Sequence, residues 1–514
     1  MGDLAVVGLA TAVVLAIGVL LLRRVRRAAD RAGRRVLLRA RARVDRFKFA
    51  RRSEVRAGLL HDPVIAEAVA RHAAEHGVDE QQVWMTVRGY VDEIVPAFNV
   101  LVYYRFGLAV ARFFLDLFYR VSVDHADRAA LRALPRDAVV VYLMNHRSNA
   151  DYVLVGYALS GQVAISYAVG EWARAFPLEP LFKAFGAYFI RRRFREPLYH
   201  TVLERYVQLI TRNGVTQGIF PEGGLTRDGR LRPAKIGLLD YILGVAREPA
   251  FRPRMYLVPV GINYDRVLED RSLLRELAVS EGAARTSRAT QLREVVRYLW
   301  WNLGRLAVGR WSRYGRAAVT VGVPIPLAPW FARMEQESGD LFALSRPERL
   351  ARVQVLCDSA MMRIGEIIPV TPVPLACAAI QSLEQDFVPR SRLLGRMMEM
   401  RDALLELNGR VIQAERDIAW TLELALRMLV MRRMVVLEGD GFAILPRNRP
   451  LVSYYANSVA HLLGPFEAGV RARDALPAIT GFTGEWPVAD HGRGVDRVPG
   501  GGTMEPSRRL DAPP

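Results

Sequence analysis

The stretch Asn145-His146-Arg147-Ser148-Asn149-Ala150-Asp151 decides the fold, because it lies between two apolar segments of different character. The first segment, residues 138–144, predicts a buried strand, and the second, residues 152–159, predicts a helix. His146 is then expected at the end of a strand and Asp151 in or near the first turn of a helix. Since one tight loop joins them, the imidazole and the carboxylate can face each other.

A histidine paired with a carboxylate has a chemical consequence. A carboxylate on one ring nitrogen fixes the imidazole tautomer, so the other nitrogen is free to take a proton. Because no serine nucleophile is built into the pattern, His146 is predicted to be a base that activates a substrate hydroxyl. This spacing is a weak signal by itself, and a pair without a catalytic role is the alternative.

The region around this loop alternates between strands and helices. Strands are predicted at residues 138–144, 163–168, 187–190, 216–220, 255–260 and 317–321, and helices at residues 152–159, 198–211 and 236–245. Such alternation indicates an α/β domain with a mostly parallel sheet flanked by helices. Ligands of such sheets gather at the carboxyl ends of the strands, which is where the conspicuous motifs of this chain fall.

Consecutive arginines follow the predicted strand at residues 187–190. Arg191 and Arg192 lie directly after the strand, and their guanidinium groups can hold a phosphate through paired hydrogen bonds. The alternative is a solvated loop charge, since 69 of the 72 basic residues of this chain are arginine. The three lysines are Lys48, Lys183 and Lys235, which makes Lys235 slightly more informative than a single arginine.

A glycine-rich segment with a carboxylate follows the predicted strand at residues 216–220. It reads Pro-Glu-Gly-Gly-Leu-Thr-Arg at residues 221–227 and is followed by Lys235. Its glycines allow a substrate to approach the backbone closely. Glu222 can accept a hydrogen bond from a polyol hydroxyl, and a plain turn is the alternative. A fourth segment, residues 257–264, predicts a strand and a turn with no chemistry of its own.

The N-terminal part of the chain carries an apolar span and most of the excess charge. The 514 residues have a formal net charge of +19, and residues 23–56 hold fifteen Lys or Arg against three acidic residues. Residues 4–22 are an uncharged stretch long enough for one membrane-spanning helix. The positive charge follows the span, which predicts an outside N-terminus and a cytoplasmic remainder rather than a signal peptide. A helix lying in the membrane surface is the alternative.

The basic segment is expected to contact anionic lipid head groups. A nucleic-acid-binding arm is the rival interpretation of such a charge run, and the adjoining apolar span disfavours it. Residues 100–121 mix aromatic residues with arginines and predict an interfacial helix, with a core helix as the alternative. Cys357 and Cys377 lie in apolar surroundings without a Cys-x-x-Cys motif, so neither a disulfide framework nor a metal site is expected.

Helical patterns also flank the α/β region. The predicted helices are residues 23–49, 63–77 and 80–91 on the N-terminal side and residues 374–383, 393–407, 410–430 and 451–463 on the C-terminal side. A short strand-like piece is predicted at residues 434–445. The segment from residue 480 to the end is rich in Gly, Pro and charge, which predicts a disordered tail.

Taken in order, the motifs resemble those of the glycerophospholipid acyltransferase superfamily. The matching segments are Asn-His-Arg-Ser-x-x-Asp at 145–151, Gly-x-x-Phe-Ile-Arg-Arg at 186–192, Pro-Glu-Gly-Gly-x-Thr-Arg at 221–227 and Val-Pro-Val at 258–260. The Gly-Arg-Leu-Arg-Pro-Ala-Lys run at 229–235 and the segments at 370–374 and 452–458 are similar to the membrane-bound glycerol-3-phosphate and dihydroxyacetone-phosphate acyltransferases. The chain departs from the family pattern at Leu225, where an arginine is usual, and at Thr226, where a serine is usual.

The resemblance implies a reaction and a site. His146 would take the proton of the sn-1 hydroxyl of glycerol 3-phosphate while Asp151 orients the imidazole, and the alkoxide would attack the thioester of acyl-CoA or acyl-ACP. Arg192, assisted by Arg191, would hold the phosphate. The residues expected to bind the glycerol moiety are Glu222, Gly223 and Thr226, with Arg227 and Lys235 as outer cations. No cofactor or metal is implied beyond the acyl donor, and no nucleic acid is an expected partner.

The sequence patterns and the resemblance together predict a division of the chain, although the N-terminal span follows from the residues and not from the resemblance. The expected parts are a transmembrane helix at 1–22, a basic helical region at 23–99, an acyltransferase domain at 100–369, a helical region at 370–479 and a disordered tail at 480–514. The expected place of action is the cytoplasmic face of the cell membrane, in the first step of phospholipid biosynthesis. The alternatives are acylation of lysophosphatidate or dihydroxyacetone phosphate and, more remotely, an inactive membrane adaptor.

Overall fold

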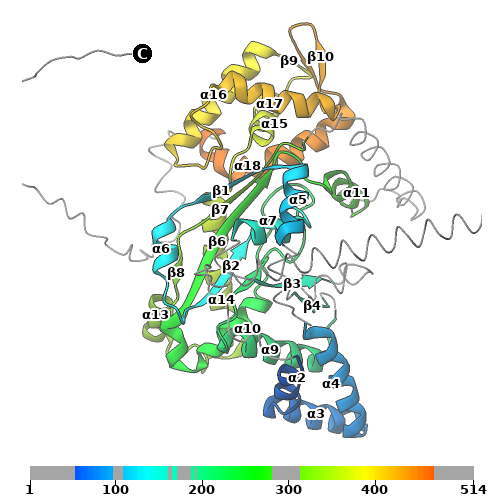
Figure 1. Ribbon diagram of the computed structural model, residues 1–514, viewed down its shortest axis with the longest axis vertical. Coiled ribbons are helices and arrows are strands. Elements are labelled where there is room, and N and C mark those ends of the chain that lie inside the picture. Colours follow the sequence, from blue (N-terminus) through cyan, green and yellow to red (C-terminus); the bar gives the residue numbers. More distant parts are fainter. Residues whose placement is uncertain are drawn as a thin grey trace, which may run out of the picture.

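The structure is a computed structural model that describes residues 52–96, 108–159, 165–170, 187–191, 194–280 and 313–467. Its centre is a sheet with the strand order β1-β7-β6-β2-β5-β3-β4, to which β8 is added beside β6 (Figure 1). The strands are β1 (Arg120–His125), β2 (Val139–Met144), β3 (Ser166–Gly170), β4 (Tyr188–Ile190), β5 (Gln217–Ile219), β6 (Met255–Tyr264), β7 (Arg316–Val321) and β8 (Ile325–Pro326).

The prediction of a mostly parallel sheet is confirmed. β2 pairs in parallel with both β5 and β6, and β3 pairs in parallel with β4 and β5. The exceptions are β7 and β8, which both run antiparallel to β6, and β1, which is parallel to β7. β6 is also longer than predicted, because its second half, Val260 to Tyr264, pairs with β7 after its first half has paired with β2. This extension carries Tyr264 to the carboxyl end of the sheet.

Each face of the sheet has its own hydrophobic cluster, because side chains alternate along a strand. On β2, Val139, Val141 and Leu143 belong to one cluster, and Val140, Tyr142 and Met144 belong to the other. The helices whose side chains join the first cluster are α2 (Arg52–Leu60), α3 (Pro63–His76), α4 (Glu80–Ile94), α9 (Pro197–Arg212), α10 (Gly237–Leu243), α13 (Ala328–Ser338) and α14 (Arg346–Glu366).

The helices of the other cluster come from two parts of the chain, residues 108–280 and 372–467. They are α5 (Leu108–Phe118), α7 (Asp151–Ala158), α11 (Asp270–Ser280), α15 (Pro372–Leu383), α16 (Arg390–Glu406), α17 (Ile418–Met431) and α18 (Arg449–Glu467). The short helix α6 (Arg128–Ala133) follows β1. A small antiparallel sheet, β9 (Phe387–Pro389), β10 (Val436–Glu438) and β11 (Gly441–Ala443), lies among the C-terminal helices at the top of Figure 1.

Two helix predictions needed correction, and some helices of the structure were not predicted at all. The predicted helix at 100–121 ends at Phe118, because β1 begins at Arg120 and pairs with β7. The predicted helix at 410–430 begins only at Ile418, where the Asp417 side chain accepts from the backbone N–H of Ala419 and caps the helix. The 21-residue α14, which begins with a Ser345–Glu348 capping box, was not predicted.

Several predictions concern residues outside those described. They are the membrane span at 4–22, the basic helix at 23–49, the first part of the interfacial helix at 100–107 and the tail at 480–514. Among the residues that are described, none of the helices combines the length and the hydropathy needed to cross a membrane.

Candidate active site

His146 and Asp151 face each other in the loop between β2 and α7, as predicted. The Nδ1 atom of His146 lies 3.0 Å from Oδ2 of Asp151, and both side chains are at most 1% exposed. The backbone N–H groups of Arg147 and Ser148 donate to the same oxygen over 2.7 and 3.0 Å. The loop therefore wraps around one carboxylate oxygen at the first residue of α7.

Tyr264 completes this arrangement from β6. Its hydroxyl donates to Oδ1 of Asp151 over 2.6 Å, so both carboxylate oxygens are occupied. Burial, with the neighbouring Asp151 charge, holds the pKa of Tyr264 well above its usual value, which keeps the hydroxyl a donor. Sequence reasoning placed Tyr264 in a plain strand and turn. No local signal marks it, because its position depends on the β6–β7 pairing.

The imidazole is held by its neighbours as well as by Asp151. Phe220 stacks on the ring with the centroids 4.1 Å apart, and Tyr152 meets it edge-on at 5.6 Å. With Nδ1–H donated to the carboxylate, Nε2 is left as the basic nitrogen. The geometry is that of a general base whose tautomer and rotation are both fixed.

Glu222 joins the glycine-rich segment to the histidine loop. Its Oε1 accepts from the backbone N–H of His146 over 2.8 Å, and its Oε2 accepts from that of Arg232 over 3.1 Å. The carboxyl is 1% exposed, and this burial raises its pKa to about 7. Glu222 therefore holds the backbone at His146 and at Arg232 in place. Its predicted hydrogen bond to a substrate hydroxyl stays a prediction.

The other predicted residues of this segment lie around the same turn. Gly223 has a φ of +65°, and a Cβ there would lie 2.8 Å from Cδ of Lys235, whose side chain passes over the glycine. The Thr226 hydroxyl donates to Asp228 over 3.0 Å and accepts from the backbone N–H of Gly229. Arg227 is partly exposed and contacts Glu276 at 3.3 Å. Thr226 thus shapes the turn, and Lys235 is the cation that lies over it.

Of Arg191 and Arg192, which follow β4, the structure describes only Arg191. Arg191 donates from Nε to Glu93 of α4 over 2.9 Å and lies over the rings of Tyr90, Phe194 and Tyr199. Its guanidinium is therefore already paired with a carboxylate. Arg192, the main candidate for phosphate, lies outside the described residues.

Residues that sequence reasoning did not single out fasten this loop to the rest of the molecule. Ser148 Oγ and the backbone N–H of Asn149 donate to the carboxylate of Glu269, over 2.7 and 3.2 Å. The Asn145 side chain exchanges two hydrogen bonds with the backbone of Ile262 in β6. These contacts connect residues more than 110 positions apart, so only the folded chain reveals them.

Arg147 connects the loop to α18. Its guanidinium is 1% exposed and donates to the backbone oxygens of Gly229 and, over 3.1 Å, Ser458. Asn457 donates from the same helix to the backbone oxygen of Asp228. Burial lowers the pKa of Arg147, although nearby acidic groups favour its charge. The 452–458 segment noted in the sequence therefore packs directly on the candidate site.

A cluster of three or more His, Cys, Asp or Glu side chains able to hold a metal ion is not found among the residues that the structure describes. Cys357 and Cys377 are both buried and are not joined in a disulfide. Burial raises the pKa of the Cys357 thiol to about 12, so it is not an activated nucleophile.

The chain is similar in sequence to known acyltransferases. The acyltransferase family model matches residues 129–263, and the model of the glycerol-3-phosphate acyltransferase C-terminal region matches residues 299–465. A glycerol-3-phosphate acyltransferase of Aeromonas hydrophila is 28% identical over 423 residues, which are 79% of this chain and 49% of that relative. The chain spans about half the length of this curated relative.

Proposed function

We propose that this chain, which belongs to the glycerol-3-phosphate acyltransferase branch of the glycerophospholipid acyltransferases, transfers an acyl group from acyl-CoA or acyl-ACP to the sn-1 hydroxyl of glycerol 3-phosphate. The observation that carries the proposal is the His146–Asp151 pair at the carboxyl end of β2, inside the matched acyltransferase region. The matched C-terminal region and the name of the relative favour glycerol 3-phosphate over lysophosphatidate and dihydroxyacetone phosphate as the acceptor.

The proposed reaction is a direct transfer. Nε2 of His146 takes the proton of the acceptor hydroxyl as its oxygen attacks the thioester carbonyl, and the tetrahedral intermediate collapses with loss of the thiolate. The imidazolium returns the proton to the thiolate, which leaves as a free thiol. Asp151 stabilises the imidazolium, and Tyr264 and two backbone N–H groups hold Asp151 in place. A general base of this kind contributes about 10²–10⁴-fold in rate.

The phosphate of the acceptor is proposed to bind Arg192, with Lys235 and Arg227 as outer cations. Arg191 is the weaker candidate, because a phosphate would have to compete with Glu93 for its guanidinium. Gly223 allows close approach of the glycerol moiety to the backbone, and Glu222 keeps that backbone beside His146. Loss of the usual arginine at Leu225 makes Lys235 the more important cation of this segment.

The proposed place of action is the cytoplasmic face of the cell membrane. Support comes from the apolar span at 4–22, the basic segment that follows it and α5, where Phe113 is 64% exposed next to Arg112. Such an exposed aromatic beside a cation suits a helix that lies at the lipid–water interface.

The test is acyl transfer by the purified full-length protein with radiolabelled glycerol 3-phosphate and, separately, with lysophosphatidate and dihydroxyacetone phosphate. The wild type should acylate glycerol 3-phosphate, and His146→Ala should lose at least about 100-fold in turnover. His76→Ala, at an exposed histidine in the last turn of α3, is the matched control. If His146→Ala kept more than roughly a tenth of the turnover, His146 would not be the base. Transfer to lysophosphatidate alone would overturn the proposed acceptor, and absence of transfer to all three acceptors would favour the adaptor.

A further inference from the structure

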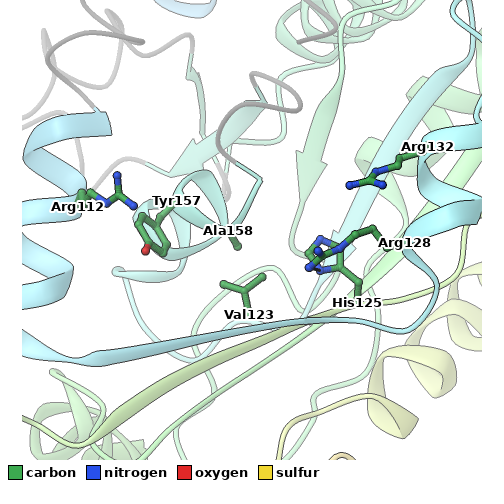
Figure 2. Close-up of a pocket in the computed structure, with 7 residues that line it drawn as sticks. All are labelled: Arg112, Val123, His125, Arg128, Arg132, Tyr157 and Ala158. Carbon is green, nitrogen blue, oxygen red and sulfur yellow. Dashed lines mark hydrogen bonds between the residues drawn. The ribbon is translucent and has the colours of Figure 1, made fainter. Parts of the chain in front are cut away.

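A basic cavity of about 310 Å³ lies away from the His146 loop, among α5, β1, α6 and α7. Figure 2 shows Arg112 and Tyr157 on one side of it and His125, Arg128 and Arg132 on the other. Val123 and Ala158 lie between them. Since a water molecule takes up about 30 Å³ in the liquid, the cavity has room for a phosphate group and part of the molecule that carries it.

The three arginines of the cavity are available for an anion. Within the described part of the chain, neither Arg112, Arg128 nor Arg132 forms an ion pair. Two carboxylates next to His125 and Arg128 in the sequence have other partners. Asp124 pairs with Arg410 at 3.7 Å, and Asp127 caps α6 by accepting from the backbone N–H of Ala130 over 2.8 Å. None of the described residues that line the cavity is acidic, so the cavity concentrates positive charge.

His125 adds a hydrogen-bond donor to this charge. Arg128 donates from Nη2 to Nδ1 of His125 over 3.3 Å, and because a guanidinium can only donate, the ring proton must lie on Nε2. That Nε2 is buried, and it has no hydrogen-bond partner among the described residues. Burial and the Arg128 charge lower the pKa of His125, which favours the neutral ring with its proton on Nε2.

The helix α5 beside the cavity points to the kind of molecule that could supply an acceptor oxygen for Nε2 of His125. Arg112 lies on α5, and its neighbour Phe113 is 64% exposed, as expected of a helix that inserts an aromatic ring into a lipid surface. Arg112 also lies 5.6 Å from the ring centroid of Tyr157, which brings it to the α7 wall of the cavity. With α5 at a lipid–water interface, a phosphate bound here would lie among the lipid head groups.

We propose that this cavity binds the phosphate of an anionic phospholipid head group and thereby fixes the orientation of the sheet on the bilayer. Arg112, Arg128 and Arg132 supply the charge, and His125 supplies a directed donor. The same chemistry would suit the phosphates of coenzyme A, so the test must separate these two sources. The proposal does not depend on the acyl transfer proposed above, because neither His146 nor Asp151 lines the cavity.

The experiment is calorimetric titration of the full-length protein in neutral detergent with short-chain phosphatidylglycerol, after subtraction of the titration into detergent alone. Arg128→Ala/Arg132→Ala should weaken binding at least about tenfold, since two basic residues at a lipid surface are removed. Arg71→Ala/Arg88→Ala is the matched control, because it removes the same charge from exposed positions of α3 and α4. Arg128 and Arg132 are also exposed, so the double variant should have the unfolding temperature of the wild type, as measured by circular dichroism.

Three parallel titrations identify the source of the phosphate. Short-chain phosphatidylcholine, which carries no net charge, should bind more weakly than phosphatidylglycerol, and inorganic phosphate should compete only at high concentration. Equal losses in the two double variants would show general charge attraction and overturn the site. Binding of coenzyme A that depends on Arg128 and Arg132, together with phosphatidylglycerol binding that does not, would overturn the lipid assignment.

Discussion

At the scale of single residues, the candidate site is built around one carboxylate. Asp151 accepts from His146, from two backbone N–H groups and from Tyr264, and none of these contacts is open to solvent. In such surroundings a charged group is stabilised by fixed donors in place of water. The imidazole can therefore become charged during transfer without rearrangement of its partners.

Tyr264 should act through Asp151, so Tyr264→Phe should lower kcat about tenfold or more with little change in the Michaelis constants, because a hydrogen bond to a charged group is lost. With one donor fewer, the Asp151 carboxylate would attract the imidazolium more strongly. The acid limb of the pH–rate profile should therefore move to higher pH. Tyr119→Phe is the control, since it removes a buried hydrogen bond to the backbone of Arg266 and leaves Asp151 untouched. A fall in kcat without movement of the acid limb would indicate a merely structural role.

Glu222 should make stability depend on pH. Its pKa is raised from 4.5 to about 7 by burial, so between these values the folded protein binds more protons than the unfolded chain. The free energy of unfolding of the wild type, relative to Glu222→Gln, should therefore fall as the pH rises from 4.5 to 7, by at most about 1.4 kcal/mol per pH unit. Thermal unfolding of both proteins across this range measures the difference.

The Glu222→Gln substitution should also remove a hydrogen bond and so lower the stability of the protein. The amide has one oxygen where the carboxyl has two, and its NH2 group cannot accept, so one of the two backbone N–H groups loses its acceptor and the variant should be less stable at pH 5. Glu399→Gln, at an exposed glutamate of α16, should follow the wild type across the range. A relative stability that rises with pH instead would mean that the two N–H donors outweigh burial at Glu222.

At the scale of elements, α18 closes the candidate site from the C-terminal side. Gly229 comes so close to this helix that a Cβ would lie 1.9 Å from the backbone oxygen of Tyr454. Arg147 and Asn457 donate across the same contact. Helix and turn thus meet backbone to backbone, an approach that only glycine permits.

Gly229→Ala should therefore destabilise the protein by at least about 2–3 kcal/mol, from strain at a φ of +87° together with the clash. Gly77→Ala is the matched control, because Gly77 also has a positive φ and has nothing within 4 Å of its Cβ position. Thermal unfolding of the two variants separates the effects. Equal losses of stability would show that backbone strain alone matters and that α18 yields at Gly229.

At the scale of the whole molecule, the chain is expected to attach to membrane through more than one segment. Removing residues 1–22 should weaken binding to anionic vesicles without abolishing it, because residues 23–56 and α5 remain and each basic residue near the surface contributes about 1 kcal/mol. The remaining binding should decrease as salt is added. Vesicle flotation at low and high salt measures both effects, and a truncated protein that stays fully unbound at low salt would contradict the interfacial role of these segments.

The sequence by itself determined the local features of this protein. Apolar runs and their lengths predicted β2, α7 and α9, and the spacing from His146 to Asp151 predicted their contact, because one loop of six residues leaves the two side chains few other arrangements. The mostly parallel sheet followed from the alternation of strands and helices.

Only the tertiary structure decided which distant residues complete the site. Tyr264 reaches Asp151 because β6 runs past β2 to pair with the antiparallel β7, and no local pattern encodes that choice of partner. In the sequence Arg147 is one arginine among many, and only its packing against α18 shows that it is buried. Only the fold shows that both oxygens of Glu222 accept hydrogen bonds from backbone N–H groups. The physical reason is that hydrophobic periodicity acts within a segment, whereas burial and hydrogen-bond partners depend on how segments pack together.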